Sequence, residues 1–357
     1  MEPKPQAVGR SILPSANKDW LALHQEPIID PAQPIIDPHH HLWNAPRERY
    51  LLDELEADCA RGHNIIATIF AECTEGYLTT GPEHLRSAGE TAFAAQIGQE
   101  ADARNIPHGI CAGIISYADL RQGAAVEEVL DAHLKAGAGR FRGIRQSTAW
   151  DRNEAVRTTI RTPPEGVLRE PVFREGFAVL TRMGLTFDSW VYHPQLSDVA
   201  DLARAFPGAN IILDHVGGPI GIGPYAGMRD EVLRVWEKGI RDIASCQNVT
   251  VKLGGLGMRL GGFGFHELPR PPSSEDLAAA WKPYVETCID AFGPARCMFE
   301  SNFPVDEISC GYDVLWNAFK RLAAGGSADE KDDLFWRTAS RVYRISAGSA
   351  YQADIGA

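Results

Sequence analysis

Eight short β-rich runs, each followed by a helical pattern or by a long loop and a helix, constrain the fold of this chain most strongly. They are residues 34–38, 64–73, 108–117, 140–146, 184–192, 209–216, 248–255 and 296–301. Strands that alternate with helices form parallel sheets, because a crossover helix brings the next strand in parallel. Eight such units favour closure into a barrel. The sequence therefore predicts an α/β fold, a single-domain (β/α)8 TIM barrel.

The predicted helices and termini complete this barrel. Apolar residues at helical spacing predict helices over residues 85–104, 119–137 and 273–293. Residues 327–345 are predicted to form a terminal helix that packs on the barrel exterior. The barrel domain is expected to span residues 34–350, and residues 1–33 are interpreted as an N-terminal arm laid across the barrel bottom.

Composition narrows the class of protein. A chain of 357 residues with 44% hydrophobic residues is long enough for a barrel with a sizeable core. No apolar run reaches membrane-spanning length, and the first residues lack the apolar core of a secretory signal, so we expect a cytoplasmic protein without a membrane partner. The net charge of -12 repels phosphate backbones and argues against nucleic acid as a partner. The expected partner is a small-molecule substrate, and homo-oligomerisation is left open.

The cysteines and serines argue against covalent catalysis. The seven cysteines form no CxxC pair, so we expect reduced, buried thiols rather than a disulfide framework or a zinc knuckle. No GxSxG motif is present. The long glycine-rich connection 254–273 matches no phosphate-binding motif and is either a mobile lid or a packed loop.

Histidines gather where this fold places its chemistry. In such barrels the active site lies at the C-terminal ends of the strands. In the segment IIDPHHHLW, His39 and His41 alternate onto the same side of the first strand and can converge on one ion. His193 and His215 follow the fifth and sixth strands. Because neutral imidazole is the commonest metal ligand and also titrates near neutrality, the four predict a metal or acid/base site.

Other side chains at the predicted strand ends have either a functional or a structural interpretation. Glu72 is either a metal ligand or base, or a buried partner for a nearby Arg or His. Arg145 either holds a substrate carboxylate or carbonyl with its planar fork, or forms a structural ion pair with Asp188 or Glu300. Four aromatic residues either wall an apolar pocket or belong to the core: Trp43, Tyr77, Trp150 and Tyr192.

These segments together resemble the amidohydrolase superfamily, in particular its lactonase-like branch. That branch includes 2-pyrone-4,6-dicarboxylate lactonase, sugar-acid lactonases and sulfomuconolactone hydrolase. The resemblance rests on IIDPHHHLW, TIFAEC, GETAFAAQ, RFRGIRQSTAWD, YHPQL, DHVGGP and MFESNFPVD, which fall in order over residues 35–306. It implies a (β/α)8 barrel whose His39 and His41 bind a divalent metal ion or, in metal-free members, the substrate itself. Together with the strand-end residues above, the expected metal ligands are His39, His41, Glu72 and His215.

The chain departs from the family pattern at two positions. Asn302 stands where the family usually carries the aspartate that activates water, and an amide cannot take a proton at neutral pH. Gln146 stands where a histidine is common. Another carboxylate, such as Asp306, Glu300 or Glu72, then serves as the base, or a metal ion makes a weak base sufficient, or Asn302 donates a hydrogen bond to an oxyanion.

Three functions follow from these residues. The first is a metal-assisted hydrolase of a small cyclic ester, a carboxylated or sugar-derived lactone, with zinc as the expected ion and a metal-free site as the alternative. In it His193 or His215 moves protons, and the substrate is bound by Arg145, Trp43, Tyr77, Tyr192 and Gln146. The second is a metal-dependent decarboxylase of an aromatic or unsaturated carboxylate. The third is a catalytically silent ligand-binding barrel.

Overall fold

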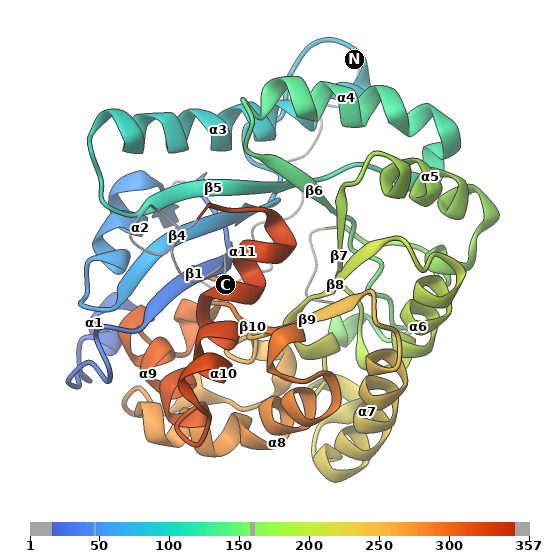
Figure 1. The fold of residues 1–357 in the computed structure, drawn as a ribbon. Coiled ribbons are helices and arrows are strands. Elements are labelled where there is room, and N and C mark those ends of the chain that lie inside the picture. The colour runs from blue at the N-terminus through green and yellow to red at the C-terminus, as the bar shows by residue number, and fades with distance from the viewer. Residues whose placement is uncertain (1–15, 46–47, 158–160, 347–357) are drawn as a thin grey trace, which may run out of the picture.

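The computed structural model describes residues 16–45, 48–157 and 161–346, and in them eight parallel strands form one sheet (Figure 1). The strands in order are β1 (Pro34–His40), β4 (Asn64–Ala71), β5 (Gly109–Ser116), β6 (Phe141–Arg145), β7 (Thr186–Ser189), β8 (Asn210–Leu213), β9 (Val249–Leu253) and β10 (Cys297–Phe299). Just beyond β10, Asn302 N donates to His39 O over 2.9 Å, and His41 N donates to Phe303 O over 2.7 Å. These bonds bring the last strand back to the first. The predicted (β/α)8 barrel is confirmed.

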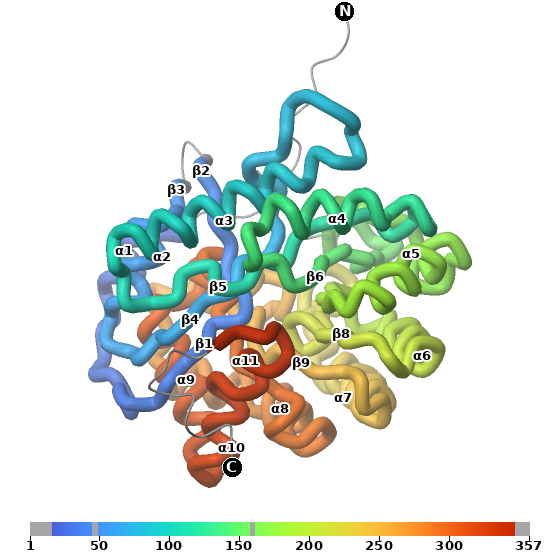
Figure 2. The backbone as a smooth tube through the Cα atoms, turned by 45° about the horizontal axis from the view of Figure 1, so that its top comes forward, coloured from blue at the N-terminus to red at the C-terminus, as the bar shows by residue number. Residues whose placement is uncertain are grey.

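Helices cover the outside of the strands (Figures 1 and 2). They are α2 (Leu52–Cys59), α3 (Ala88–Ala103), α4 (Val126–Ala136), α5 (Pro171–Arg182), α6 (Leu196–Ala205), α7 (Arg229–Ala244), α8 (Ser274–Phe292) and α9 (Tyr312–Leu322). The predicted helices over 85–104, 119–137 and 273–293 correspond to α3, α4 and α8. The start of α8 is capped by Ser273 and Asp276, which hydrogen-bond each other's backbone N–H groups. A short hairpin of β2 (Trp43–Ala45) and β3 (Glu48–Tyr50) precedes α2.

The C-terminal segment closes one end of the barrel, which corrects its predicted place on the exterior. It is broken into α10 (Ala328–Asp332), a π-helical turn (Asp333–Arg337) and α11 (Thr338–Tyr343). In Figure 1, α11 lies in front of the barrel centre. Its apolar side chains and those before it pack on strand residues in one buried cluster that includes Trp336, Ala339, Val342, Tyr343, Ile36, Ile69, Ile115, Ile212 and Met298. A helical pattern shows which face is apolar but not which surface it covers.

The described part of the N-terminal arm runs beside α9, not across the barrel bottom. After α1 (Lys18–Leu21), Ile29 N donates to Asn317 Oδ1 over 2.8 Å, and Lys320 Nζ donates to Asp30 O over 2.7 Å. Asn317 and Lys320 both belong to α9. Residues 1–15 of the predicted arm lie outside the described residues.

The connection 254–273 is packed, as one of its two interpretations expected. Leu256, Leu260 and Phe265 are buried, and Gly221 N donates to Leu260 O over 2.7 Å. All seven cysteines are buried thiols, as predicted. None of the helices in residues 16–45, 48–157 and 161–346 combines the length and apolar character needed to cross a membrane.

Candidate active site

The end of β1 places His39 and His41 side by side inside the barrel mouth. Both are buried, and their Nε2 atoms lie 3.3 Å apart. His41 Nδ1 lies 2.9 Å from Ala71 O, which can only accept, so this nitrogen carries the proton and Nε2 carries a lone pair. Two nitrogen ligands at about 2.05 Å from a tetrahedral ion are about 3.3 Å apart. The spacing of the two imidazoles therefore fits a single metal ion.

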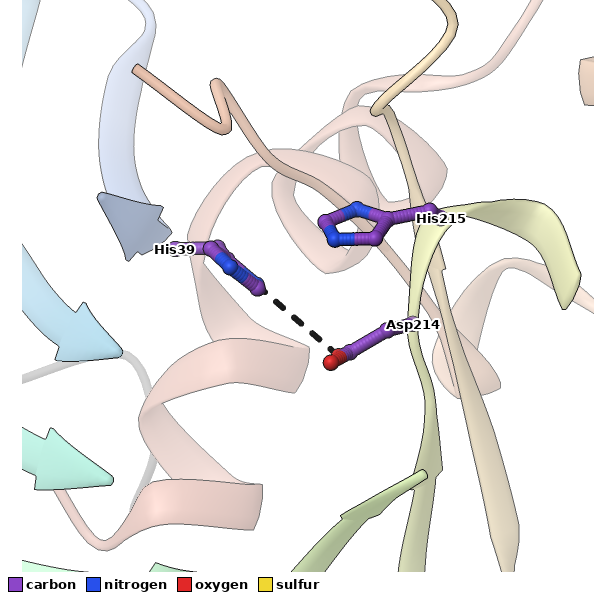
Figure 3. Close-up of side chains that lie close together, drawn as sticks. All are labelled: His39, Asp214 and His215. Carbon is purple, nitrogen blue, oxygen red and sulfur yellow. Dashed lines mark ion pairs between the residues drawn. The ribbon is translucent and has the colours of Figure 1, made fainter. Parts of the chain in front are cut away.

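His215 joins this pair, and Glu300 orients it. The rings of His39 and His215 are 4.6 Å apart. Glu300 Oε1 accepts from His215 Nδ1 over 2.7 Å and from the His215 backbone N–H over 3.1 Å, and Glu300 Oε2 lies 3.0 Å from His39 Nδ1. Figure 3 shows His39, Asp214 and His215 facing one another, and one ligand atom from each lies within 4.8 Å of the others. Glu300 thus holds imidazoles from two strands, as carboxylates do behind metal-binding histidines.

The interior beside these imidazoles is acidic. Asp188, Asp214 and Glu300 are fully buried, and the cation that pairs with two of them is Lys252. Among the described residues, Asp188 Oδ1, Asp214 Oδ2 and Glu300 Oε2 accept no hydrogen bond. Buried carboxylates are costly unless a cation balances them. These three carboxylates carry two more negative charges than the Lys252 ammonium balances. This donor set therefore fits a divalent metal ion.

Arg145 pairs with Glu72, not with Asp188 or Glu300 as one interpretation expected. Arg145 Nε lies 3.2 Å from Glu72 Oε1, and Arg161 Nη1 lies 2.8 Å from Glu72 Oε2. Burial raises the pKa of Glu72, but Arg161 and Arg145 outweigh it and lower this pKa below its usual value. Both carboxylate oxygens are occupied by guanidinium groups. The structure therefore favours the interpretation of Glu72 as a buried ionic partner over that of a metal ligand.

Arg161 is a site residue that the sequence pattern did not reveal. It lies in the long connection after β6, its Nη2 donates to Tyr77 OH over 2.5 Å, and its guanidinium stacks 3.6 Å from the centre of the Tyr117 ring. Its side chain is 26% exposed, more than that of Arg145 at 11%. With two arginines facing one glutamate, this side of the mouth carries a net positive charge.

Asp306 is hydrogen-bonded to Asn302, the residue at the position where the family usually carries an aspartate. Asn302 Nδ2 donates to Asp306 Oδ1 over 2.7 Å, and Gly257 N donates to Asp306 Oδ2 over 2.9 Å. Burial raises the pKa of Asp306 to about 7. A carboxylate with this pKa is suited to take a proton near neutral pH. Of the carboxylates considered as the base, Glu300 is hydrogen-bonded to His215 and lies 3.0 Å from His39, and Glu72 is bonded to two arginines, which leaves Asp306 best placed.

The remaining predicted site residues have other neighbours. The contacts of His193 are with residues outside the cluster of three histidines: its Nδ1 accepts from Ile220 N over 3.4 Å and its ring packs 5.3 Å from Tyr225. Gln146 bonds Leu120 N and Asp119, which makes it a tether between loops. Trp43 is buried and stacks on His41 at 6.0 Å.

Two of the predicted aromatic residues border hollows at the surface. Trp150 lines a hollow of about 520 Å³ together with Gln195 and Tyr225. Trp150 and Tyr192 both line a second hollow of about 300 Å³. A role of these two residues in a substrate pocket stays a prediction, and Tyr192 also packs in a buried apolar cluster with Trp190 and Ile220.

The sequence of this chain matches the amidohydrolase family over residues 36–345. It is 34% identical to protein y4mH of Sinorhizobium fredii over 334 residues, which cover 87% of this chain and 98% of that protein. It is 25% identical to an L-fucono-1,5-lactonase of Burkholderia ambifaria over 329 residues, which cover 89% of this chain and 98% of that enzyme.

Solved structures share the fold. A zinc-bound amidohydrolase of Burkholderia multivorans superposes with a TM-score of 0.65 at 22% identity, covering 87% of this chain and 99% of that one. This likeness shows a common barrel, and the sequence match extends over nearly all of it. The resemblance read from the sequence motifs is confirmed: the chain belongs to the amidohydrolase family and is an enzyme of the amidohydrolase superfamily.

Proposed function

We propose that this enzyme opens a small cyclic ester, a carboxylated or sugar-derived lactone, by attack of water. The observation that carries this proposal is the meeting of three imidazoles with a buried carboxyl group whose pKa is about 7, Asp306, at one end of the barrel. The similarity to an L-fucono-1,5-lactonase over almost its full length supports the substrate class.

Asp306 performs the proton transfers. Asp306 takes a proton from water as the water oxygen bonds to the lactone carbonyl carbon. When the ring C–O bond breaks, the leaving oxygen regains this proton from Asp306. Asn302 keeps Asp306 in place by its hydrogen bond. These steps consume one water and yield a hydroxy acid.

The three clustered histidines hold the cofactor in this proposal. A divalent metal ion at His39, His41 and His215, with zinc as the expected ion, would polarise the lactone carbonyl and lower the pKa of water. The hydrogen bonds of His41 to Ala71 O and of His215 to Glu300 leave one ring nitrogen of each available for this role. The zinc in the related Burkholderia multivorans structure is consistent with it.

Arg161→Met should raise the KM for an anionic lactone by about tenfold and leave kcat nearly unchanged. Arg145 and Arg161 together outweigh Glu72, so their positive charge favours an anionic group on the substrate, and Arg161 is the more exposed of the two. Steady-state kinetics with a charged and a neutral lactone check this. An equal loss with both lactones would contradict a role for Arg161 in binding the anionic group.

Asn302→Asp should shift the pH dependence of kcat/KM to higher pH. The new carboxylate would lie at hydrogen-bond distance from Asp306, where Asn302 now donates over 2.7 Å, and two such groups retain one proton between them beyond neutrality. The wild-type rate should rise with pH and level off above about 7, because the base form of Asp306 then predominates. A variant profile that coincides with the wild type would show that Asp306 is not the base.

A pH-indicator screen over lactones tests the function itself. The enzyme should release acid from carboxylated or sugar-derived lactones, and aromatic or unsaturated carboxylates should give no carbon dioxide. Carbon dioxide release without acid release from any lactone would replace this proposal with a decarboxylase. If neither acid nor carbon dioxide is released, a catalytically silent ligand-binding barrel would be favoured.

A further inference from the structure

Lys252 is a buried cation directly behind the candidate metal site. It belongs to β9 and is fully buried. Its Nζ lies 2.6 Å from Asp188 Oδ2, 3.1 Å from Asp214 Oδ1 and 3.1 Å from His39 Nδ1. The contacts with Asp188 and His39 have hydrogen-bond geometry, whereas the contact with Asp214 is an ion pair whose Oδ1 accepts no hydrogen bond among the described residues. The function proposed above gives this lysine no role.

The contact with His39 restricts where that ring keeps its proton. If Nδ1 accepts from Lys252, the proton sits on Nε2 and is donated to His41 Nε2, 3.3 Å away. If the proton sits on Nδ1 instead, Glu300 Oε2 accepts it at 3.0 Å, and Nε2 is left with a lone pair, 3.1 Å from Arg145 Nη1. A neutral imidazole can hold only one of these two arrangements at a time.

Only the second arrangement leaves His39 able to bind a metal through Nε2. In that arrangement the Lys252 ammonium faces an N–H group and has to leave His39, with Asp188 and Asp214 as its remaining partners. Lys252 also adds a positive charge beside a position meant for a divalent cation, which opposes binding by Coulomb repulsion. The hydrogen bond to His39 and the charge repulsion therefore both weaken metal binding.

We propose that the Lys252 ammonium is a built-in cation that competes with a divalent metal ion for His39 and so weakens metal binding by this barrel. The inference rests on the metal site of the proposed function. It concerns how tightly that site holds the ion, and it is independent of which substrate is turned over.

Lys252→Met tests the competition directly. We expect the variant to bind zinc or cobalt at least about tenfold more tightly than the wild type in calorimetric titration, because a charge and a hydrogen-bond donor to His39 are both lost. Lys320→Met is the matched control, since Lys320 is also a buried lysine, on α9, that contacts an imidazole, His63 Nδ1 at 2.8 Å. Its metal affinity should equal that of the wild type. Equal or weaker metal binding by Lys252→Met would overturn the proposal.

A crystal structure of the metal-loaded wild type keeps the proposal testable if Lys252→Met does not fold. With a metal ion on His39 Nε2, Lys252 Nζ should no longer lie within hydrogen-bond distance of His39 Nδ1 and should remain on Asp188 and Asp214. A retained contact between Lys252 and His39 Nδ1 beside a bound metal ion would contradict the competition. Neither measurement uses a lactone, so failure of the lactonase assay and failure of this inference are distinguished.

Discussion

Asp306→Asn should lower kcat/KM for lactone opening by about 10²- to 10⁴-fold, the range expected for loss of a general base. The side chain is fully buried and held by Asn302 and Gly257, and burial brings its pKa to about 7. The amide has the same shape but cannot take a proton. The rise of the wild-type rate up to about pH 7 should also disappear, because the group that titrates there is gone.

Thermal unfolding of Asp306→Asn shows whether a lost activity comes from the missing base or from a damaged fold. A carboxyl group whose pKa is raised on folding costs stability as pH rises from its unfolded pKa of about 4 toward its folded pKa. Asp306→Asn removes that cost, so its thermal unfolding temperature above neutral pH should equal or exceed that of the wild type. Asp58→Asn is a suitable control, because Asp58 is a buried carboxylate on α2 that accepts hydrogen bonds from Tyr50 and Arg61. The kcat/KM of the Asp58→Asn variant should equal that of the wild type. A nearly normal rate in Asp306→Asn would exclude Asp306 as the base.

His39→Ala and His41→Ala should each abolish metal uptake and turnover. Their Nε2 atoms are 3.3 Å apart and form the core of the candidate site, so removing either leaves only two of its three histidine ligands. Metal analysis of protein purified without chelator, together with the lactone assay, gives both results from one preparation. Normal activity in either variant would remove the proposed site.

His40 supplies the matched control for these two substitutions. It lies between them in the chain, is fully buried, and points the other way, toward Phe70 at 6.2 Å. Among the described residues neither of its ring nitrogens has a hydrogen-bond partner, so His40→Leu loses no bond. Metal uptake and turnover should both persist in His40→Leu. This contrast isolates the side of the strand that faces the barrel interior.

The strand order and the pairing of His39 with His41 could be predicted because they follow from local periodicity. Alternation along a strand puts residues two apart on one side, and eight strand and helix units close into one barrel. The place of the terminal helix could not be predicted, because an apolar stripe fits the barrel exterior as well as its open end. Tyr343, which donates to Asp188 over 2.7 Å, shows that this helix reaches the interior.

The ionic partners at the site could not be predicted from local patterns. Arg145 meets Glu72, 73 residues away, and Arg161 comes from a connection without periodicity. For Lys252 a signal was present, since a lysine in the middle of the apolar run NVTVKL has to be buried among acidic partners. The identity of those partners, Asp188 and Asp214, depends on barrel closure and is visible only in three dimensions.

Hydrolysis in heavy-oxygen water tests most directly whether these residues open a lactone with water. With a lactone found in the acid-release screen, the product should carry one heavy oxygen, located in its new carboxylate group, and Asp306→Asn should slow its appearance. A product without the heavy oxygen, or one that has lost carbon dioxide, would contradict attack of water on a cyclic ester.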